Sequence, residues 1–364
     1  MSIYLDYQAT TPLAPEARAA MLPWLGSEDG FANPHSPHKM GRAAAAAVEV
    51  AREAVAALLP KGGRLYFTSG ATEALNWAIK GNVGARGAIA LPDTEHAAVR
   101  DTALWLGECG HGVTLMPVRN DGLLDLAEIP AGQALVAVMH VNNEIGVIQP
   151  IGEIARRAHA AGALMLCDAV QSYGRVAIPD GPDLIAISAH KIYGPKGIGA
   201  LWVRDGVTLD PLLHGGGQEG GVRSGTLSPA LCAGFGAAAE LARGRFETDD
   251  NHVAYLWDEA LAEIPESWTI NGSITNRYKG NLNIHMNQID ASRLISDVRG
   301  AAFSAGSACA SGSGRSSHVL RALGLTEAQA RSSIRLGFGR YTTADDVRTA
   351  LQMIKTAAAA QEVG

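Results

Sequence analysis

Short apolar runs alternate with amphipathic segments through the middle of the chain, between about residue 64 and residue 203. Short apolar runs bounded by glycine, proline or polar residues are typical of buried strands, whereas apolar residues at helical spacing are typical of amphipathic helices. Strands are therefore expected at residues 65–68, 88–91, 113–116, 135–141, 163–167, 184–188 and 200–203. Helices are expected at residues 72–80, 95–107 and 151–161. This alternation predicts an α/β fold with a largely parallel sheet.

The segments that flank this region have a different pattern. A short strand is expected at residues 3–7, and helical spacing continues at residues 16–25, 42–59, 229–243, 249–263 and 343–360. Residues 280–286 again alternate between polar and apolar side chains. We expect a large domain of residues 15–255 and a smaller α+β domain that combines residues 1–14 with residues 256–364.

Composition and charge exclude several classes of protein. The chain has 364 residues, of which 47% are hydrophobic and 18% charged, as in an ordinary globular protein. Its formal net charge of -6 provides no overall cationic field that would recruit nucleic acid or anionic lipid. No secretory signal and no bilayer-spanning apolar stretch is visible, and the cysteines lack CxxC spacing. We expect a cytoplasmic protein with neither a nucleic-acid nor a membrane partner.

One lysine lies where cofactor sites of α/β folds are found. The expected strand at residues 184–188 leads directly through Ser188 and His190 to Lys191, before Gly194 breaks the pattern. Lys191 is thus placed at the end of a strand, at the sheet edge where ligands of such folds bind. A solvated lysine in a turn is the alternative interpretation of this segment alone.

Two further segments suggest what the lysine binds. Asp168 ends another apolar strand, and a buried carboxylate there needs a partner such as a protonated heteroaromatic nitrogen, unless it caps a helix. Residues 69–72 run from a strand into a helix, where they form either an anion cradle of backbone amides or a plain helix cap. They match neither the dinucleotide-binding nor the nucleoside-triphosphate-binding sequence pattern. An anion cradle, Asp168 and Lys191 together match the phosphate, ring nitrogen and aldehyde of pyridoxal phosphate.

Motifs along residues 4–340 resemble those of the cysteine desulfurases, the NifS/IscS-like branch of the class-V aminotransferase family. The matching motifs are YLDYQATTP, FTSGATE, TEHAAV, MHVNNEIGV, DAVQS, SAHKIYGPKGIGAL, HGGGQEGGVRSGT, GSACAS, VLRALG and SSIRLGFGR. The resemblance implies the fold of pyridoxal-phosphate-dependent transferases. This fold has a large domain with a mostly parallel seven-stranded sheet flanked by helices, and a smaller α+β domain.

The resemblance also implies roles for individual residues. Lys191 would bind the cofactor aldehyde covalently, Asp168 would pair with the ring nitrogen, and His96 would lie against the ring and move protons. The phosphate would be held by Ala71, Thr72, Ser188 and His190, and the phenolic-oxygen side of the ring by Asn143 and Gln171. Substrate binding would involve Arg335, which grips a carboxylate, together with Asn143 and Asn33. Thr226 would reach the cofactor of a neighbouring subunit in a homodimer.

The cysteines differ in their sequence contexts. Cys167 and Cys232 lie in apolar segments typical of inert core thiols, and Cys109 is in a glycine-containing turn. Cys309 lies in a Gly/Ser/Ala-rich loop at about residues 303–317, and sulfur transfer needs a thiolate on an arm that reaches the cofactor. The motif match implies that Cys309 is the nucleophile. No resident metal is expected, although Cys309 would be able to ligate an iron–sulfur cluster transiently.

The implied reaction converts L-cysteine to L-alanine and leaves a persulfide on Cys309, from which sulfur passes to an acceptor protein such as an iron–sulfur cluster scaffold. The alternatives are a selenocysteine lyase or a class-V aminotransferase on the same fold. A sulfur-carrying or cofactor-binding protein without turnover is a third alternative, which the joint presence of Lys191, Asp168, His96 and Cys309 disfavours.

Overall fold

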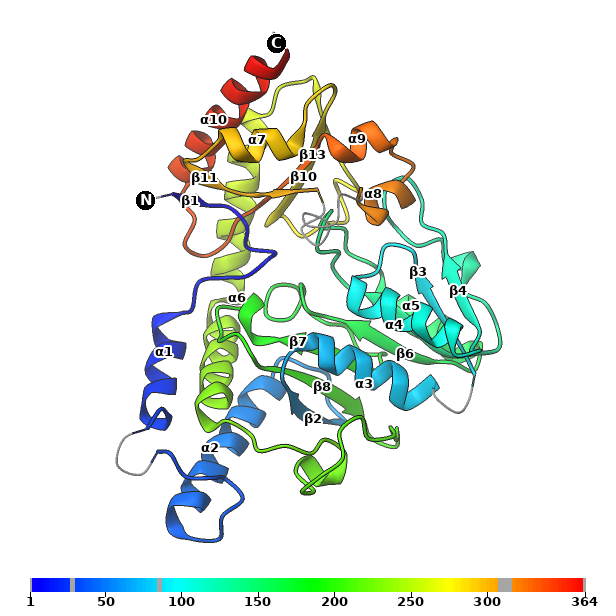
Figure 1. Ribbon diagram of the computed structural model, residues 1–364, viewed down its shortest axis with the longest axis vertical. Helices are drawn as coiled ribbons and strands as arrows, with labels where there is room; N and C mark the ends of the chain where they lie inside the picture. Colours follow the sequence, from blue (N-terminus) through cyan, green and yellow to red (C-terminus); the bar gives the residue numbers. More distant parts are fainter. Residues whose placement is uncertain (1, 27–29, 84–86, 307–315, 363–364) are drawn as a thin grey trace.

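A seven-stranded sheet is the centre of the larger part of the computed structural model, which describes residues 2–26, 30–83, 87–306 and 316–362 (Figure 1). Its strand order is β2-β8-β7-β6-β5-β3-β4, and all neighbours are parallel except β8, which is antiparallel to β2 and β7. The bounds are β2 (Gly63–Thr68), β3 (Ala88–Pro92), β4 (Val113–Met116), β5 (Gln133–Met139), β6 (Leu164–Asp168), β7 (Leu184–Ser188) and β8 (Gly199–Arg204). The predicted mostly parallel sheet is confirmed.

Helices cover both faces of this sheet. Alternate residues of each strand point to opposite faces, so Val136 and Val138 of β5 join one core whereas Leu135 and Ala137 join the other. The first face is covered by α1 (Pro15–Met21), α2 (Lys39–Ala56), α5 (Ile151–Ala160) and the first part of α6 (Pro229–Glu263). The second face is covered by α3 (Ala71–Val83) and α4 (Ala97–Glu108). The strands are buried on both sides, which explains their continuous apolar runs.

A smaller sheet lies at the other end of α6 (Figure 1). Its order is β12-β13-β10-β9, with β9 (Trp268–Ile270), β10 (Asn281–Met286), β12 (Ser304–Ala305) and β13 (Ser333–Gly337). Beside it, β1 (Ile3–Tyr4) pairs in parallel with β11 (Ala301–Ala302). The remaining helices of the described residues are α7 (Ala291–Asp297), α8 (His318–Ala322), α9 (Glu327–Arg331) and α10 (Ala344–Glu362). A separate apolar core here includes Leu256, Ile284 and Leu351. The division into domains near residue 255 stays a prediction.

Several predicted element boundaries differ from the structure for identifiable reasons. The helix predicted at residues 16–25 ends at Met21 and continues as a 3₁₀ turn (Leu22–Trp24), because Pro23 cannot donate an intrahelical hydrogen bond. The helix predicted at residues 95–107 begins at Ala97, because the His96 side chain accepts a hydrogen bond from the Ala98 amide and caps the helix. The predicted strand at residues 3–7 is limited to Ile3–Tyr4.

The largest difference is at α6. Two helices are predicted at residues 229–243 and 249–263, but the structure has one helix of 35 residues from Pro229 to Glu263. The segment between the predicted helices contains no proline, and the exposed Gly244 disfavours a helix by only about 1 kcal/mol. Packing of both halves, for example Phe235 in one core and Trp257 in the other, outweighs that preference. In the part of the chain that the structure describes, no helix is long and apolar enough to cross a membrane.

Replacement of glycine by alanine should have opposite effects at two positions of α6. A Cβ added to Gly244 would meet no atom within 4 Å, so Gly244→Ala should stabilise the protein by about 0.5–1 kcal/mol through improved helix propensity. A Cβ added to Gly236 would lie 2.8 Å from Cα of Ala51 in α2, so Gly236→Ala should destabilise by about 1–3 kcal/mol. Urea unfolding of the two variants measures both changes. Equal effects of the two substitutions would contradict this description of α6.

Candidate active site

A cavity of about 500 Å³ lies at the carboxyl ends of the parallel strands. Asp168 is the last residue of β6 and Ser188 the last residue of β7, and α3 begins beside them after β2. Because these strand ends share one edge of the sheet, polar residues from distant parts of the sequence converge there. The cavity has the size of an ordinary small-molecule site. Its polar lining includes Gln8, Ser69, Thr72, His96, Asn143, Asp168, Gln171, Ser188, His190, Lys191, Lys196 and Arg335.

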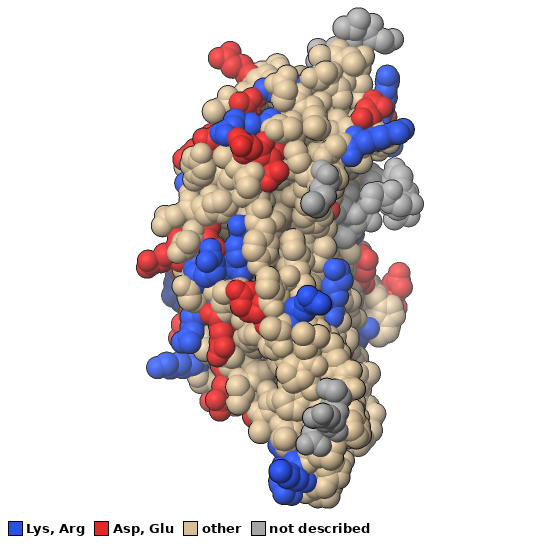
Figure 2. Space-filling model, turned by 90° about the vertical axis from the view of Figure 1, so that its left-hand side faces the viewer, with Lys and Arg blue, Asp and Glu red and all other residues tan. Residues whose placement is uncertain are grey.

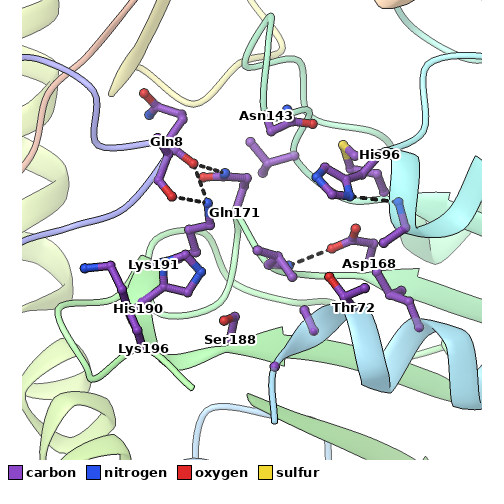
Figure 3. Close-up of a pocket in the computed structure, with 18 of the residues that line it drawn as sticks. Gln8, Thr72, His96, Asn143, Asp168, Gln171, Ser188, His190, Lys191 and Lys196 are labelled. Carbon is purple, nitrogen blue, oxygen red and sulfur yellow. Dashed lines mark hydrogen bonds between the residues drawn. The ribbon is translucent and has the colours of Figure 1, made fainter. Parts of the chain in front are cut away.

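Lys191 ends the 3₁₀ turn that follows β7 (Ala189–Lys191), and its amine points into the cavity (Figure 3). Its Nζ donates hydrogen bonds to the backbone oxygens of Gln8 at 2.5 Å and Ala9 at 2.7 Å. Burial, reinforced by the positive charges of Arg175 and Arg335, lowers the pKa of Lys191 to about 7. At neutral pH a substantial fraction of the amine is therefore uncharged, as a nucleophile or general base requires.

Gln8 and Arg175 hold this lysine in place. The backbone oxygen of Gln8 also accepts a hydrogen bond from Nε2 of Gln171 at 2.9 Å. Arg175 donates to the side-chain oxygen of Gln171 at 2.9 Å and to the backbone oxygen of Lys191. Sequence reasoning assigned a role to Gln171 and Lys191 but missed Gln8, Ala9 and Arg175. Backbone carbonyl contacts leave no side-chain signature, and the available signal was that Gln8 and Ala9 lie in a matching motif.

Asp168 and His96 lie across the cavity from Lys191 (Figure 3). Asp168 Oδ1 accepts a hydrogen bond from the Val170 amide at 3.0 Å, and burial raises the pKa of its carboxyl. His96 Nδ1 accepts from the Ala98 amide at 3.0 Å, and burial lowers the pKa of its imidazole. The Nδ1 bond leaves the ring proton of a neutral His96 on Nε2. A cationic ring nitrogen beside Asp168 would offset the desolvation of its carboxylate.

The end of the cavity beside Thr72 and Ser188 can hold an anion. The amides of the first turn of α3, near Thr72, have no partner within the helix and carry the positive end of its dipole. A Cβ on Gly199 would lie 2.7 Å from the Gly70 backbone carbon, so β8 approaches this turn closely. Ser188 and His190 lie at the same end (Figure 3). Burial lowers the pKa of His190 to about 4, so its neutral ring is available for hydrogen bonding.

Arg335 connects the smaller sheet to the cavity. It lies in the middle of β13, and its side chain is only 1% exposed. Its Nη2 donates to Asp6 Oδ1 at 2.7 Å and its Nη1 donates to the backbone oxygen of Asn143 at 2.9 Å. Each terminal nitrogen carries a second N–H, so the guanidinium keeps donors for a substrate carboxylate.

The structure brings most of the predicted site residues together and leaves others apart. The cavity is lined by Ala71, Thr72, His96, Asn143, Asp168, Gln171, Ser188, His190, Lys191 and Arg335. Asn33 and Thr226 are exposed and do not line it within this chain, so their roles stay predictions. Cys309 lies outside the described residues, and its role likewise stays a prediction.

The described residues fit pyridoxal phosphate by their chemistry. The helix N-terminus of α3 suits a phosphate, a lysine with a lowered pKa suits an aldehyde, and a carboxylate in the same cavity suits a pyridinium nitrogen. These three groups occupy different walls of one cavity, as a single ligand carrying all three functions requires (Figure 3).

Comparisons with known proteins place the chain among related sequences and structures. The profile of a family described as class-V aminotransferases matches residues 3–349. The chain is 42% identical over 372 aligned positions to a cysteine desulfurase IscS of Rickettsia akari, covering 97% of this chain and 90% of that protein. A NifS-like protein structure matches with a TM-score of 0.90 at 30% identity, covering 98% of this chain and 99% of that one. SspA in complex with cysteine matches with a TM-score of 0.83 at 34% identity, covering 94% and 100%.

Arg175→Gln should raise the pKa of Lys191, because removal of a neighbouring cation favours the ammonium form. The measurement is the pH dependence of Lys191 acetylation in the cofactor-free protein, followed by mass spectrometry, and the reactivity profile should move to higher pH. Arg175→Lys keeps the charge and should keep the profile. Arg156→Gln, which alters an exposed pair with Glu153, is the matched control. An unchanged profile in Arg175→Gln would exclude this electrostatic cause.

Proposed function

The chain belongs to the class-V aminotransferase family, and from this premise we infer that it is a pyridoxal-phosphate-dependent cysteine desulfurase. Such an enzyme converts L-cysteine to L-alanine and passes the sulfur to one of its own thiols. The observation that carries the inference is the convergence of Lys191, Asp168 and the N-terminus of α3 on one cavity at the sheet edge. High identity to proteins named cysteine desulfurase supports the choice among the reactions of the family.

The cavity residues divide the chemistry between them. Pyridoxal phosphate, when bound, would withdraw electrons from the substrate Cα as its proton leaves. Lys191 would hold the cofactor and, once displaced by the substrate amine, would take the α-proton and return it, which its pKa of about 7 permits. Asp168 would keep the ring nitrogen protonated, and the first turn of α3 with Ser188 and His190 would hold the phosphate.

The substrate would be oriented from the smaller sheet. We propose that the free N–H groups of Arg335 bind the carboxylate of L-cysteine, with Asn143 beside it. The Asp6 carboxylate and the Asn143 backbone oxygen fix the plane of the guanidinium before substrate arrives. A substrate held in this way would lie in the cavity that Lys191 also lines.

The sulfur would leave by attack of a thiolate. Cys309 would form an S–S bond to the substrate sulfur while the substrate C–S bond breaks, and the electron pair of that bond would return to carbon. Protonation of this carbon gives alanine, and Cys309 retains a persulfide. Release of the sulfur to an acceptor protein or to a reducing thiol regenerates Cys309, so the reducing cytoplasm is the compartment that we propose.

We also propose that the enzyme works as a homodimer. Thr226 is exposed and does not line the cavity of its own chain, so we assign it to the cofactor of the neighbouring subunit. Arg223, three residues earlier, pairs with Glu73 of α3 at 2.7 Å and holds this segment at the surface beside the first turn of α3. The side of the molecule that carries α1 and α2 has a wide area without charged side chains (Figure 2). An apolar groove of about 320 Å³ lies between α1, α2 and α6, lined by residues such as Trp24 and Val50. This groove is our candidate for the dimer interface.

Cys309→Ser should abolish alanine formation from L-cysteine while the protein still binds the cofactor, because the thiolate is lost and the cavity residues remain. Alanine release and the visible cofactor absorbance measure the two properties. Cys109→Ser removes an exposed thiol and serves as the control. Full cysteine turnover in Cys309→Ser would exclude Cys309 as the nucleophile, and consumption of an α-keto acid would instead support an aminotransferase.

Val50→Glu should convert the dimer to monomers, because Val50 is 64% exposed in the groove and a buried carboxylate there would have no partner. Sedimentation velocity measures the change. Ile274→Glu alters a side chain that is 60% exposed outside the groove and should leave the dimer intact. An intact dimer in Val50→Glu would place the interface elsewhere.

A further inference from the structure

Two hydrogen bonds join the beginning of α8 to the segments that carry His96 and Asn143. The Ser317 hydroxyl donates to Oε2 of Glu144 at 2.5 Å, and His318 Nε2 donates to the backbone oxygen of Glu95 at 2.9 Å. Glu95 and Glu144 directly adjoin the cavity residues His96 and Asn143 in the sequence. The start of α8 is therefore tied to two walls of the active site.

The backbone of Glu144 is held on both sides by hydrogen bonds. Its amide donates to Oδ1 of Asn142 at 2.9 Å, and its backbone oxygen accepts from Nδ2 of Asn283 in β10 at 3.0 Å. Its side chain is buried, and burial raises the pKa of the carboxyl to about 7, although the Ser317 hydroxyl and the Arg335 cation act in the opposite direction. Burial of an ionisable carboxyl in such surroundings lowers the free energy of unfolding. The Glu144 side chain is therefore better explained by a role other than stability.

Ser317 joins the carboxyl of Glu144 to the helix. Its Oγ accepts a hydrogen bond from the Leu320 amide at 3.0 Å and so caps α8, while its proton goes to Glu144. When it is ionised, the Glu144 carboxylate only accepts hydrogen bonds, so it fixes the hydroxyl as a donor and leaves an oxygen lone pair for the cap. The first turn of α8 is thus oriented by the cavity wall.

The chain is also fixed before Cys309. The Gly306 amide donates to the Ser333 backbone oxygen at 2.7 Å, beside β13. A Cβ on Gly306 would lie 2.8 Å from Cδ1 of Leu320 and 2.9 Å from Cβ of Ser333, so this residue is closely packed against α8 and β13. In the sequence, Cys309 lies between these two attachment points, Gly306 and Ser317.

We propose that Glu144 is a positioning residue for sulfur transfer: through Ser317 it fixes the start of α8, and so one end of the segment that contains the nucleophile. The proposal rests on the proposed function of Cys309. Glu144 itself does not take part in proton removal from the substrate. Its loss should therefore slow formation of the Cys309 persulfide and spare the chemistry at the substrate Cα.

The test compares two reactions of the holoenzyme in the variants Glu144→Ala, Ser317→Ala and Glu144→Gln. Single-turnover persulfide formation from L-cysteine is followed by intact-protein mass spectrometry, and solvent exchange of the L-alanine α-proton in D₂O is followed by NMR. Because the hydrogen bond between Ser317 and Glu144 is lost, Glu144→Ala and Ser317→Ala should slow persulfide formation about tenfold. α-Proton exchange should stay within about twofold, and Glu144→Gln, which keeps an acceptor, should restore most of the persulfide rate.

Controls separate positioning from general damage. Ser316→Ala removes the neighbouring hydroxyl, which bonds the exposed Glu327 at 2.6 Å, and should leave both reactions unchanged. The double variant Glu144→Ala/Ser317→Ala should be no slower than Ser317→Ala alone, because the loss of Ser317 already removes both the contact with Glu144 and the cap of α8.

The outcomes are distinguishable. An unchanged persulfide rate in Glu144→Ala and Ser317→Ala, or an equal loss of α-proton exchange, would overturn the positioning role and leave the proposed function standing. Absence of a Cys309 persulfide in the unsubstituted protein would overturn the proposed function and this inference with it.

Discussion

Burial of the Lys191 amine beside Arg175 and Arg335 is the constraint on which the site depends. Two cations near a buried amine favour its neutral form, and Asp6 and Asp168 partly oppose this effect. The amine is nevertheless held by two backbone oxygens, so its position does not depend on its charge. The hydrogen bonds that position the amine are thereby separate from the charges that lower its pKa, a combination suited to a side chain that both binds an aldehyde and moves a proton.

The N-terminal segment connects this constraint to the smaller sheet. Leu5 packs in the smaller core and Tyr7 in the larger one, so the chain crosses between them within a few residues. Asp6 bonds Arg335, and the Gln8 side chain donates to the backbone oxygen of Gly280 at 2.8 Å. The segment whose carbonyls hold Lys191 is consequently joined to Arg335 of β13 and to Gly280, which directly precedes β10.

Sequence patterns predicted the large sheet because its strands are buried on both faces and appear as uninterrupted apolar runs. They also predicted Lys191 and Asp168, since each directly follows such a run. The small-sheet strands were mostly missed: β12 has only two residues, and β13 carries Arg335 at its centre. A charged residue normally argues against a buried strand, but the Asp6 carboxylate and the Asn143 backbone oxygen make this burial tolerable. The contacts of Gln8 and Arg175 depend on long-range packing that periodicity does not reveal.

The continuity of α6 has a consequence for folding. At 1.5 Å per residue its 35 residues extend about 50 Å, and they contribute to the apolar cores of both sheets. Neither core can lose its structure without exposing apolar side chains of a helix that the other core also needs. Partial unfolding at one end of α6 would therefore also destabilise the core at the other end. The two sheets, although they have separate cores, are thus coupled into one cooperative unit.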